Sequence, residues 1–327
     1  MTVRKYMSEF AVNMQASQVL VMPPTYLEHL SDEYFRPPYQ CHIYGIARRP
    51  RLMFNPESLV ITPEVIRGTV VAQRREKDDY YDFEVRNHPT DPVVRCECEY
   101  PYSEFRFIDA KGEVVTEGPV VQYLMMAGIG GVYPELVDLE MLYIGQAYGQ
   151  HGSRTAPQRL ASHETLQKIL AEAIQRSPDM QIWVSLFSFA DMMIASFDGR
   201  TRVYGKSEEE DDAHMLDVLG SRITEAQRIN YCEAALIRYF QPQYNTEFKN
   251  SFPSASHSSY AECYNLDLNS VTVEIDCNRV GARFWSQAMP PAWVHLISYP
   301  LHSVEERRSM FDFFPDLQPP PVQPANK

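Results

Sequence analysis

The sequence predicts an α+β protein, in which a central segment of mixed strand and helix patterns is flanked by mostly β regions. Three observations support this fold class. Short segments rich in β-branched and aromatic residues, separated by Pro, Asp, Asn and Gly, fill the first third of the chain. Helical periodicity begins only at Leu166, and strand-like composition returns after Pro253. We therefore expect a β-rich N-terminal region at 1–118, an α/β domain at 119–253, a β-rich C-terminal region at 254–314 and a disordered Pro-rich tail at 315–327.

Composition and charge restrict the class of protein. The 327 residues are 44% hydrophobic and 22% charged, which is ordinary for globular proteins. The sequence has neither the apolar run of a signal peptide nor that of a membrane span, so we expect a soluble cytoplasmic protein with no membrane association. The net charge of −13 argues against a broad basic surface for nucleic acid, although a local basic groove would suffice.

Two groups of residues carry little functional signal. The acidic run Glu208–Asp212 is expected to be a solvated loop. The six cysteines show no paired spacing, and Cys96 and Cys98 would share one face of a strand. We therefore expect buried thiols and no zinc site.

The individual elements follow from composition and periodicity. In the N-terminal region we expect strands at Ser58–Thr62, Thr69–Ala72, Tyr81–Val85, Val93–Cys98 and Phe105–Ile108. In the central domain we expect strands at Val120–Ala127, Leu139–Gln146 and Met180–Phe189, a helix whose apolar face runs from Leu166 to Ile174, and a helix from about Glu225 to Phe240 that ends before Pro242. In the C-terminal region the best strands are Asn265–Asp276 and Ala292–Tyr299.

The central domain also holds side chains suited to phosphate and metal chemistry. Arg159 and His163 stand at i and i+4, so they share one face near the start of a helix, where the helix field favours a phosphate. Glu233 lies in a later amphipathic helix. Because Mg²⁺ keeps most of its waters and needs only one or two protein carboxylates, one glutamate is enough for it, or for Mn²⁺, where zinc would require more ligands.

The order of these blocks resembles a GIY-YIG nuclease domain over about residues 120–250. Tyr143-Ile144-Gly145 resembles the YIG strand, and Arg159 with His163 resembles the Arg-x-x-x-His helix start. Glu233, followed by Pro242 and Asn245, resembles the glutamate helix and its Pro-x-x-Asn exit. The resemblance implies a three-stranded antiparallel sheet with flanking helices and one divalent metal.

Carried over, the resemblance implies roles for individual residues. Glu233 would bind the metal, Arg159 would hold the scissile phosphate, and His163 would carry a proton or contact the phosphate. Tyr143 would belong to the catalytic group, and a tyrosine would act as general base. Asn245 would contact substrate or, more readily, fix the exit of the domain.

Two points in the motif stay open. Arg154, in an insertion-like segment after Gly145, competes with Arg159 for the phosphate. The first-motif tyrosine is either Tyr133, in a GIY-like Gly-Val-Tyr followed at once by Pro134, or Tyr123, in the expected strand Val120–Ala127.

Two functions from different classes remain. The first is a metal-dependent endonuclease acting on nucleic acid, DNA rather than RNA, with β-rich flanks that select a substrate or a protein partner. The second is a non-catalytic scaffold that keeps the nuclease-like fold, which the acidity of the chain favours. Whether the two β regions form one assembly or two is also open, and pairing between strands before Pro119 and after Pro253 would decide it.

Overall fold

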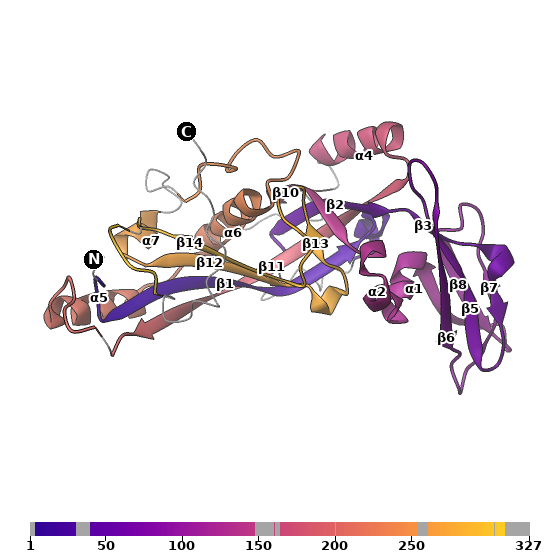
Figure 1. Ribbon diagram of the computed structural model, residues 1–327, viewed down its shortest axis with the longest axis horizontal. Helices are drawn as coiled ribbons and strands as arrows, with labels where there is room; N and C mark the ends of the chain where they lie inside the picture. Colours follow the sequence, from indigo (N-terminus) through magenta and orange to yellow (C-terminus); the bar gives the residue numbers. More distant parts are fainter. Residues whose placement is uncertain are drawn as a thin grey trace.

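A seven-stranded sheet, in the order β13-β10-β2-β11-β1-β12-β14, forms the body of the protein (Figure 1). The computed structural model describes residues 4–30, 40–147, 160, 164–199, 201–253, 261–303 and 305–310. Strands β1 (Ser8–Met22) and β11 (Met180–Phe197) are long and pair antiparallel along most of their length. Helices pack on this sheet, so the expected α+β class is confirmed.

Strand β2 (Ile43–Pro50) occupies the middle of an antiparallel trio. It pairs with β10 (Leu139–Gln146) on one edge and with β11 on the other. β10 has the predicted bounds, and β11 extends the predicted strand by eight residues beyond Phe189. The short strand β13 (Phe284–Trp285) pairs with the first two residues of β10 only. The rest of the outer edge of β10 is therefore left to other partners.

Strands β1 and β2 of the N-terminal region share the seven-stranded sheet with strands of the C-terminal region, and the other N-terminal strands lie in separate sheets. β12 (Ser270–Asp276) runs parallel to β1, and β14 (Val294–Pro300) pairs antiparallel with β12. Strands before Pro119 and after Pro253 are thus hydrogen-bonded neighbours. The three segments expected at 1–118, 119–253 and 254–314 all contribute strands to this sheet.

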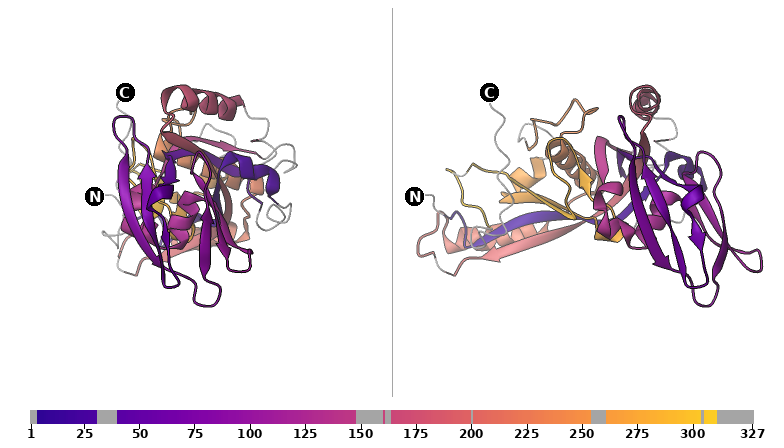
Figure 2. Two further views of the ribbon diagram at one scale, coloured as in Figure 1. Left: turned by 90° about the vertical axis from the view of Figure 1, so that its right-hand side faces the viewer. Right: turned by 45° about the vertical axis from the view of Figure 1, so that its right-hand side comes forward.

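Residues 51–138 form a separate β unit between β2 and β10, which we call the inserted unit. Figures 1 and 2 show it at one end of the molecule, with β1 and β11 running away from it. Its two sheets enclose the rings of Phe54, Phe83, Phe105, Phe107 and Tyr123. The strands are β3 (Leu52–Phe54), β4 (Val60–Ile61), β5 (Val65–Ala72) and β6 (Asp79–Arg86) in one sheet, and β7 (Val93–Glu97), β8 (Glu104–Asp109) and β9 (Val114–Pro119) in the other.

The strand predicted at Val120–Ala127 was wrong, because this segment is the helix α1 (Val120–Met126). A short apolar run does not distinguish a buried strand from a buried helix turn. Val120, Val121 and Leu124 are buried together, at the i, i+1 and i+4 spacing of a helix, and Pro119 precedes the first turn. α2 (Ile129–Val132) follows and leads back to β10.

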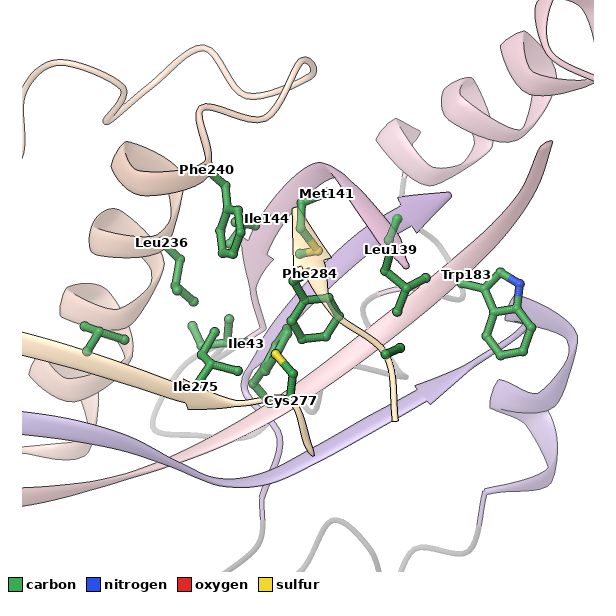
Figure 3. Packing of buried hydrophobic residues seen from close by; sticks show 14 of the residues in the cluster. Ile43, Leu139, Met141, Ile144, Trp183, Leu236, Phe240, Ile275, Cys277 and Phe284 are labelled. Carbon is green, nitrogen blue, oxygen red and sulfur yellow. The ribbon is translucent and has the colours of Figure 1, made fainter. Parts of the chain in front are cut away.

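Helices cover both faces of the antiparallel trio. α4 (Glu164–Arg176) packs Leu166 and Ile169 into a cluster with Tyr44 and Leu142. α6 (Glu225–Phe240), close to its predicted bounds, packs on the opposite face, where Figure 3 shows Leu236 and Phe240 among the apolar side chains of the sheet. The remaining short elements are α7 (Ala261–Asn265) and the 3-10 helices Pro24–His29, Pro56–Ser58, Pro134–Leu136 and Asn278–Val280. Among the described residues, none of the helices combines the length and apolarity that a membrane crossing needs.

The acidic run is helical, which corrects the expectation of a solvated loop. It begins α5 (Glu208–Gly220), and Ser207 and Glu210 form a capping box at the helix start. Carboxylates in a first turn are stabilised by the positive end of the helix dipole. Asp211 is buried and accepts hydrogen bonds from the backbone N–H and hydroxyl of Ser8, at 3.0 and 2.9 Å. The run therefore attaches α5 to the start of β1.

Burial of His295 on β14 makes stability sensitive to acid. Its ring is fully buried against Tyr239 and Phe240, and burial lowers its pKa to about 4 from an ordinary value of 6.5. Below pH 6.5 His295 binds a proton in the unfolded chain but stays neutral in the folded chain until the pH approaches 4. The free energy of unfolding therefore falls as the pH drops from 6.5 to 4. This effect amounts to about 3 kcal/mol.

We predict that His295→Gln flattens this acid dependence. Denaturant unfolding of wild type and variant between pH 4 and 8 measures it, with His88→Gln at an exposed position as the control. If the difference in unfolding free energy between wild type and His295→Gln does not change over this pH range, the assignment to His295 is incorrect.

Candidate functional site

The last four residues of β10, Tyr143 to Gln146, bring together groups from both faces of the sheet. A register shift in the pairing with β2 lies between Met141 and Tyr143. As a result Leu142 and Tyr143 both join the cluster under α4, whereas Ile144 points toward α6. Gln146 ends the strand, with its side chain on α6. The strand end thus links the two helices.

Tyr44 of β2 is the tyrosine that lies beside Tyr143. Their ring centroids are 6.2 Å apart, and the Tyr44 side chain is almost fully buried. Gly145 is paired directly with Tyr44. A Cβ at Gly145 would lie 2.7 Å from the Tyr44 Oη and 2.8 Å from Tyr143 Cε1. Only glycine permits this approach of the two phenols to the backbone.

Neither tyrosine proposed from the sequence for the first motif occupies this position. Tyr123 lies in α1, in the aromatic core of the inserted unit, where burial raises its pKa. Tyr133 follows α2 and packs against Tyr81, with ring centroids 5.0 Å apart. Both belong to the inserted unit, whereas the strand next to β10 comes from before it. The signal available in the sequence was the segment Ile43-Tyr44-Gly45-Ile46. Its distance from the Tyr-Ile-Gly block hides this signal, because the strand that pairs with it, β10, begins about ninety residues after β2 ends.

Glu233 lies in the middle of α6 and is held by the end of β10. Gln146 Nε2 donates to Glu233 Oε2 at 2.7 Å and to Asn230 Oδ1 at 3.0 Å. Burial raises the pKa of Glu233 to about 7, and the negative charge of Glu247 adds to the rise, while the Gln146 hydrogen bonds oppose it. Within the described part of the chain, no lysine or arginine forms an ion pair with Glu233. The half-buried carboxylate therefore has no cationic partner among these residues.

Asn245 fastens the exit of α6 to β10. Its side chain accepts from the Ile144 N–H at 2.9 Å and donates to the Ile144 carbonyl at 2.8 Å. The backbone N–H of Tyr244 donates to the Leu142 carbonyl at 3.0 Å. These bonds satisfy the edge of β10 beyond its pairing with β13. With both amide atoms used in this way, Asn245 has an anchoring role.

The basic members of the predicted site, Arg154, Arg159 and His163, lie outside the described residues. Of the predicted site residues within the described ranges, the structure brings Tyr143, Glu233 and Asn245 to the end of β10 and places Tyr133 in the inserted unit. Sequence reasoning missed Tyr44 and Asn230, and it placed Gln146 with the Tyr-Ile-Gly block without giving it a role. Gln146 had a signal, since it directly follows the Tyr-Ile-Gly block.

The donors around Glu233 suit a hard divalent cation better than zinc. They are carboxylate and amide oxygens, which Mg²⁺ and Mn²⁺ prefer. The part of the chain that the structure describes contains no group of three or more His, Cys, Asp or Glu side chains able to hold a metal. Mg²⁺ needs only one or two protein carboxylates because water and substrate complete its shell. Glu233, with Glu247 near enough to raise its pKa, fits that requirement.

Comparisons with protein-family models, curated protein sequences and solved structures found no match to this chain.

We predict that Gly145→Ala destabilises the protein by about 1–3 kcal/mol, because the added methyl group overlaps two tyrosines that are packed against the sheet. Gly131→Ala is the matched control, since a Cβ there meets no atom within 4 Å. Denaturant unfolding measures both variants. Equal stabilities would contradict the close approach of Tyr44 and Tyr143 to Gly145.

We also predict that Asn245→Ala lowers the free energy of unfolding by about 3 kcal/mol, because it leaves two buried backbone groups of Ile144 without partners. Asn278→Ala removes an exposed turn asparagine and should change stability by less than about 1 kcal/mol. Hydrogen exchange of the Ile144 amide gives a local readout. Unchanged protection in Asn245→Ala would show that the anchor is not needed.

Proposed function

We propose that the chain is a divalent-metal-dependent endonuclease that hydrolyses phosphodiester bonds of nucleic acid, DNA rather than RNA, on a GIY-YIG-like core. The observation that carries the proposal is the junction at the end of β10. There the Tyr-Ile-Gly block meets a second tyrosine, Tyr44, and a half-buried glutamate, Glu233, that has no ion-pair partner among the described residues.

In this proposal the core is the trio β10-β2-β11 with α4 and α6. β2 supplies the first-motif tyrosine, Tyr44, in place of Tyr123 or Tyr133. The inserted unit then interrupts the core between the first and second motif strands, so the core spans residues 43–50 and 139–245. Antiparallel pairing on both edges of β2 supports this assignment, since it makes the three strands neighbours in space.

Each residue has a role that its chemistry allows. Glu233 and the neighbouring oxygen donors would hold the cation, which when bound would polarise the phosphate and acidify a water molecule. One side chain of the Tyr44–Tyr143 pair, as the phenolate, would accept a proton from the attacking water and become the neutral phenol. Arg159 or Arg154 would grip the scissile phosphate with its forked donors, and His163 would carry a proton. Gln146 would orient the Glu233 carboxylate through its 2.7 Å hydrogen bond.

The raised pKa of the half-buried Glu233 supports a role in which its charge is needed only with a bound cation. With a pKa of about 7, the side chain is partly protonated at neutral pH. A divalent cation favours the ionised form, so binding would release a proton and strengthen as the pH rises through 7. A carboxylate kept only for structure gains nothing from this burial.

We predict that Glu233→Gln abolishes Mg²⁺- or Mn²⁺-dependent cleavage of DNA, with a loss of at least about 100-fold. Gel assays on duplex DNA, single-stranded DNA and RNA measure the activity, and Glu209→Gln in the exposed first turn of α5 is the control. In the same assay Tyr44→Phe should lower the rate and Tyr133→Phe should leave it unchanged. Intact cleavage by purified Glu233→Gln would refute the assignment.

The competing function is a non-catalytic scaffold on the same core. The net charge of −13 and the bonding of Glu233 to Gln146 favour it. Manganese binding, followed by electron paramagnetic resonance, separates the two functions. If the wild-type chain binds Mn²⁺ and Glu233→Gln does not, the nuclease is supported. If the wild-type chain does not bind Mn²⁺, the scaffold is supported.

A further inference from the structure

A cavity of about 370 Å³ lies between the start of β2, the middle of β11 and the first two turns of α6. It adjoins the end of β10 at two points. His42 Nδ1 lies 3.0 Å from the carbonyl oxygen of Ala147, the residue after Gln146. Ile229 lines the cavity and directly precedes Asn230, which accepts from Gln146. The volume falls within the range of small-molecule sites, about 300–1,000 Å³.

The wall of the cavity is apolar and aromatic. Phe187 and Phe189 lie two residues apart on β11, with ring centroids 6.2 Å apart and planes 27° from parallel. Ile43 and Ile229 complete this wall. Both side chains are almost completely buried in the core, so they give the cavity an apolar floor against which an apolar or planar ligand surface would pack.

The rim of the cavity is polar and disfavours an anion. Glu225 is partly exposed at the rim, and Asp191 lies beside it. Arg228, the arginine among the lining residues, already donates to Asp191 at 2.7 Å and lies 3.7 Å from Glu225. The guanidinium is therefore neutralised by two carboxylates, and a phosphate would meet net negative charge.

Glu225 instead suits a ligand that donates hydrogen bonds. The Ala147 carbonyl only accepts, so His42 Nδ1 carries the hydrogen and donates to it. His42 Nε2 then lies 3.7 Å from Glu225 Oε1. The rim thus presents acceptors to an occupant whose edge carries N–H groups.

We propose that this cavity receives one unpaired nucleobase of the nucleic-acid substrate, with the ring against Phe187 and Phe189 and its N–H edge on Glu225. The inference rests on the proposed function and names the form of its substrate. A guanine presents two adjacent N–H donors to a carboxylate and is the favoured base, and thymine, with one, is disfavoured. Removing a base from a duplex costs a few kcal/mol, least at an unpaired position. Bulged or single-stranded sites next to the cut are therefore preferred.

Binding of free nucleosides tests the cavity without metal or cleavage. Guanosine and thymidine are titrated into the full-length protein, and binding is followed by NMR. We expect guanosine to bind at least 10-fold more tightly than thymidine. Glu225→Gln should weaken guanosine binding at least 10-fold, because an amide offers one acceptor and turns a donor toward the base.

Glu208→Gln is the matched control. Glu208 and Glu225 are both the first residue of a helix that begins with a capping box, so the two substitutions remove the same helix-dipole contribution. Glu208→Gln should leave guanosine binding within twofold of the wild type. Equal affinities of the two variants, or no binding of millimolar guanosine by the wild type, would overturn the proposal.

A second measurement separates this proposal from the nuclease assignment. Duplex DNA with one bulged guanine is compared with fully paired duplex, in binding to Glu233→Gln and in cleavage by wild type. If binding prefers the bulged duplex in a way that depends on Glu225, but the wild type does not cleave DNA, the base site is supported and the nuclease assignment is refuted. Cleavage with no preference for the bulge supports the nuclease and overturns the base site.

Discussion

The antiparallel pairing of β2 with β10 on one edge and β11 on the other is the constraint on which the structure depends. It brings residues 43–50 next to residues 139–146 across the inserted unit, whose aromatic rings belong to the same apolar cluster as side chains of the main sheet. It sets Tyr44 opposite Gly145, and it creates two faces, one for α4 and one for α6. Without this pairing, Tyr44 would not lie beside Tyr143 of the Tyr-Ile-Gly strand.

The charge arrangement at the site follows from the same packing. α6 buries its apolar side against the sheet, and Glu233 lies at the margin of that side, where the side chain loses water. The Gln146 amide offsets only part of the cost, so the carboxylate keeps a raised pKa. In the neighbouring cavity the carboxylates do have a cation beside them, because Arg228 forms ion pairs with Asp191 and Glu225. The carboxylates of these two regions of α6 therefore have different surroundings, since Glu225 lies near Arg228 and Glu233 has no ion pair among the described residues.

Periodic and well-capped segments were predictable, and segments whose state depends on distant partners were not. The strand Leu139–Gln146 and the helix Glu225–Phe240 carry strong local signals, and the structure has both. Val120–Ala127 is apolar throughout, and packing inside the inserted unit makes it helical. The acidic run depended on Ser207 as a cap and on Ser8, two hundred residues away, as a partner for Asp211.

The sequence by itself determined the α+β class, the Tyr-Ile-Gly block, the glutamate helix and its Pro-x-x-Asn exit, because these depend on local periodicity, capping and residue order. Only the tertiary structure decided which tyrosine stands beside Tyr143, that strands of both β regions share one sheet, and that Asn245 anchors Ile144. Strand pairing is the physical reason. Its hydrogen bonds join backbone groups of any sequence separation. Two strands can therefore pair across a long insertion, although their distance in the sequence gives no sign that they are neighbours.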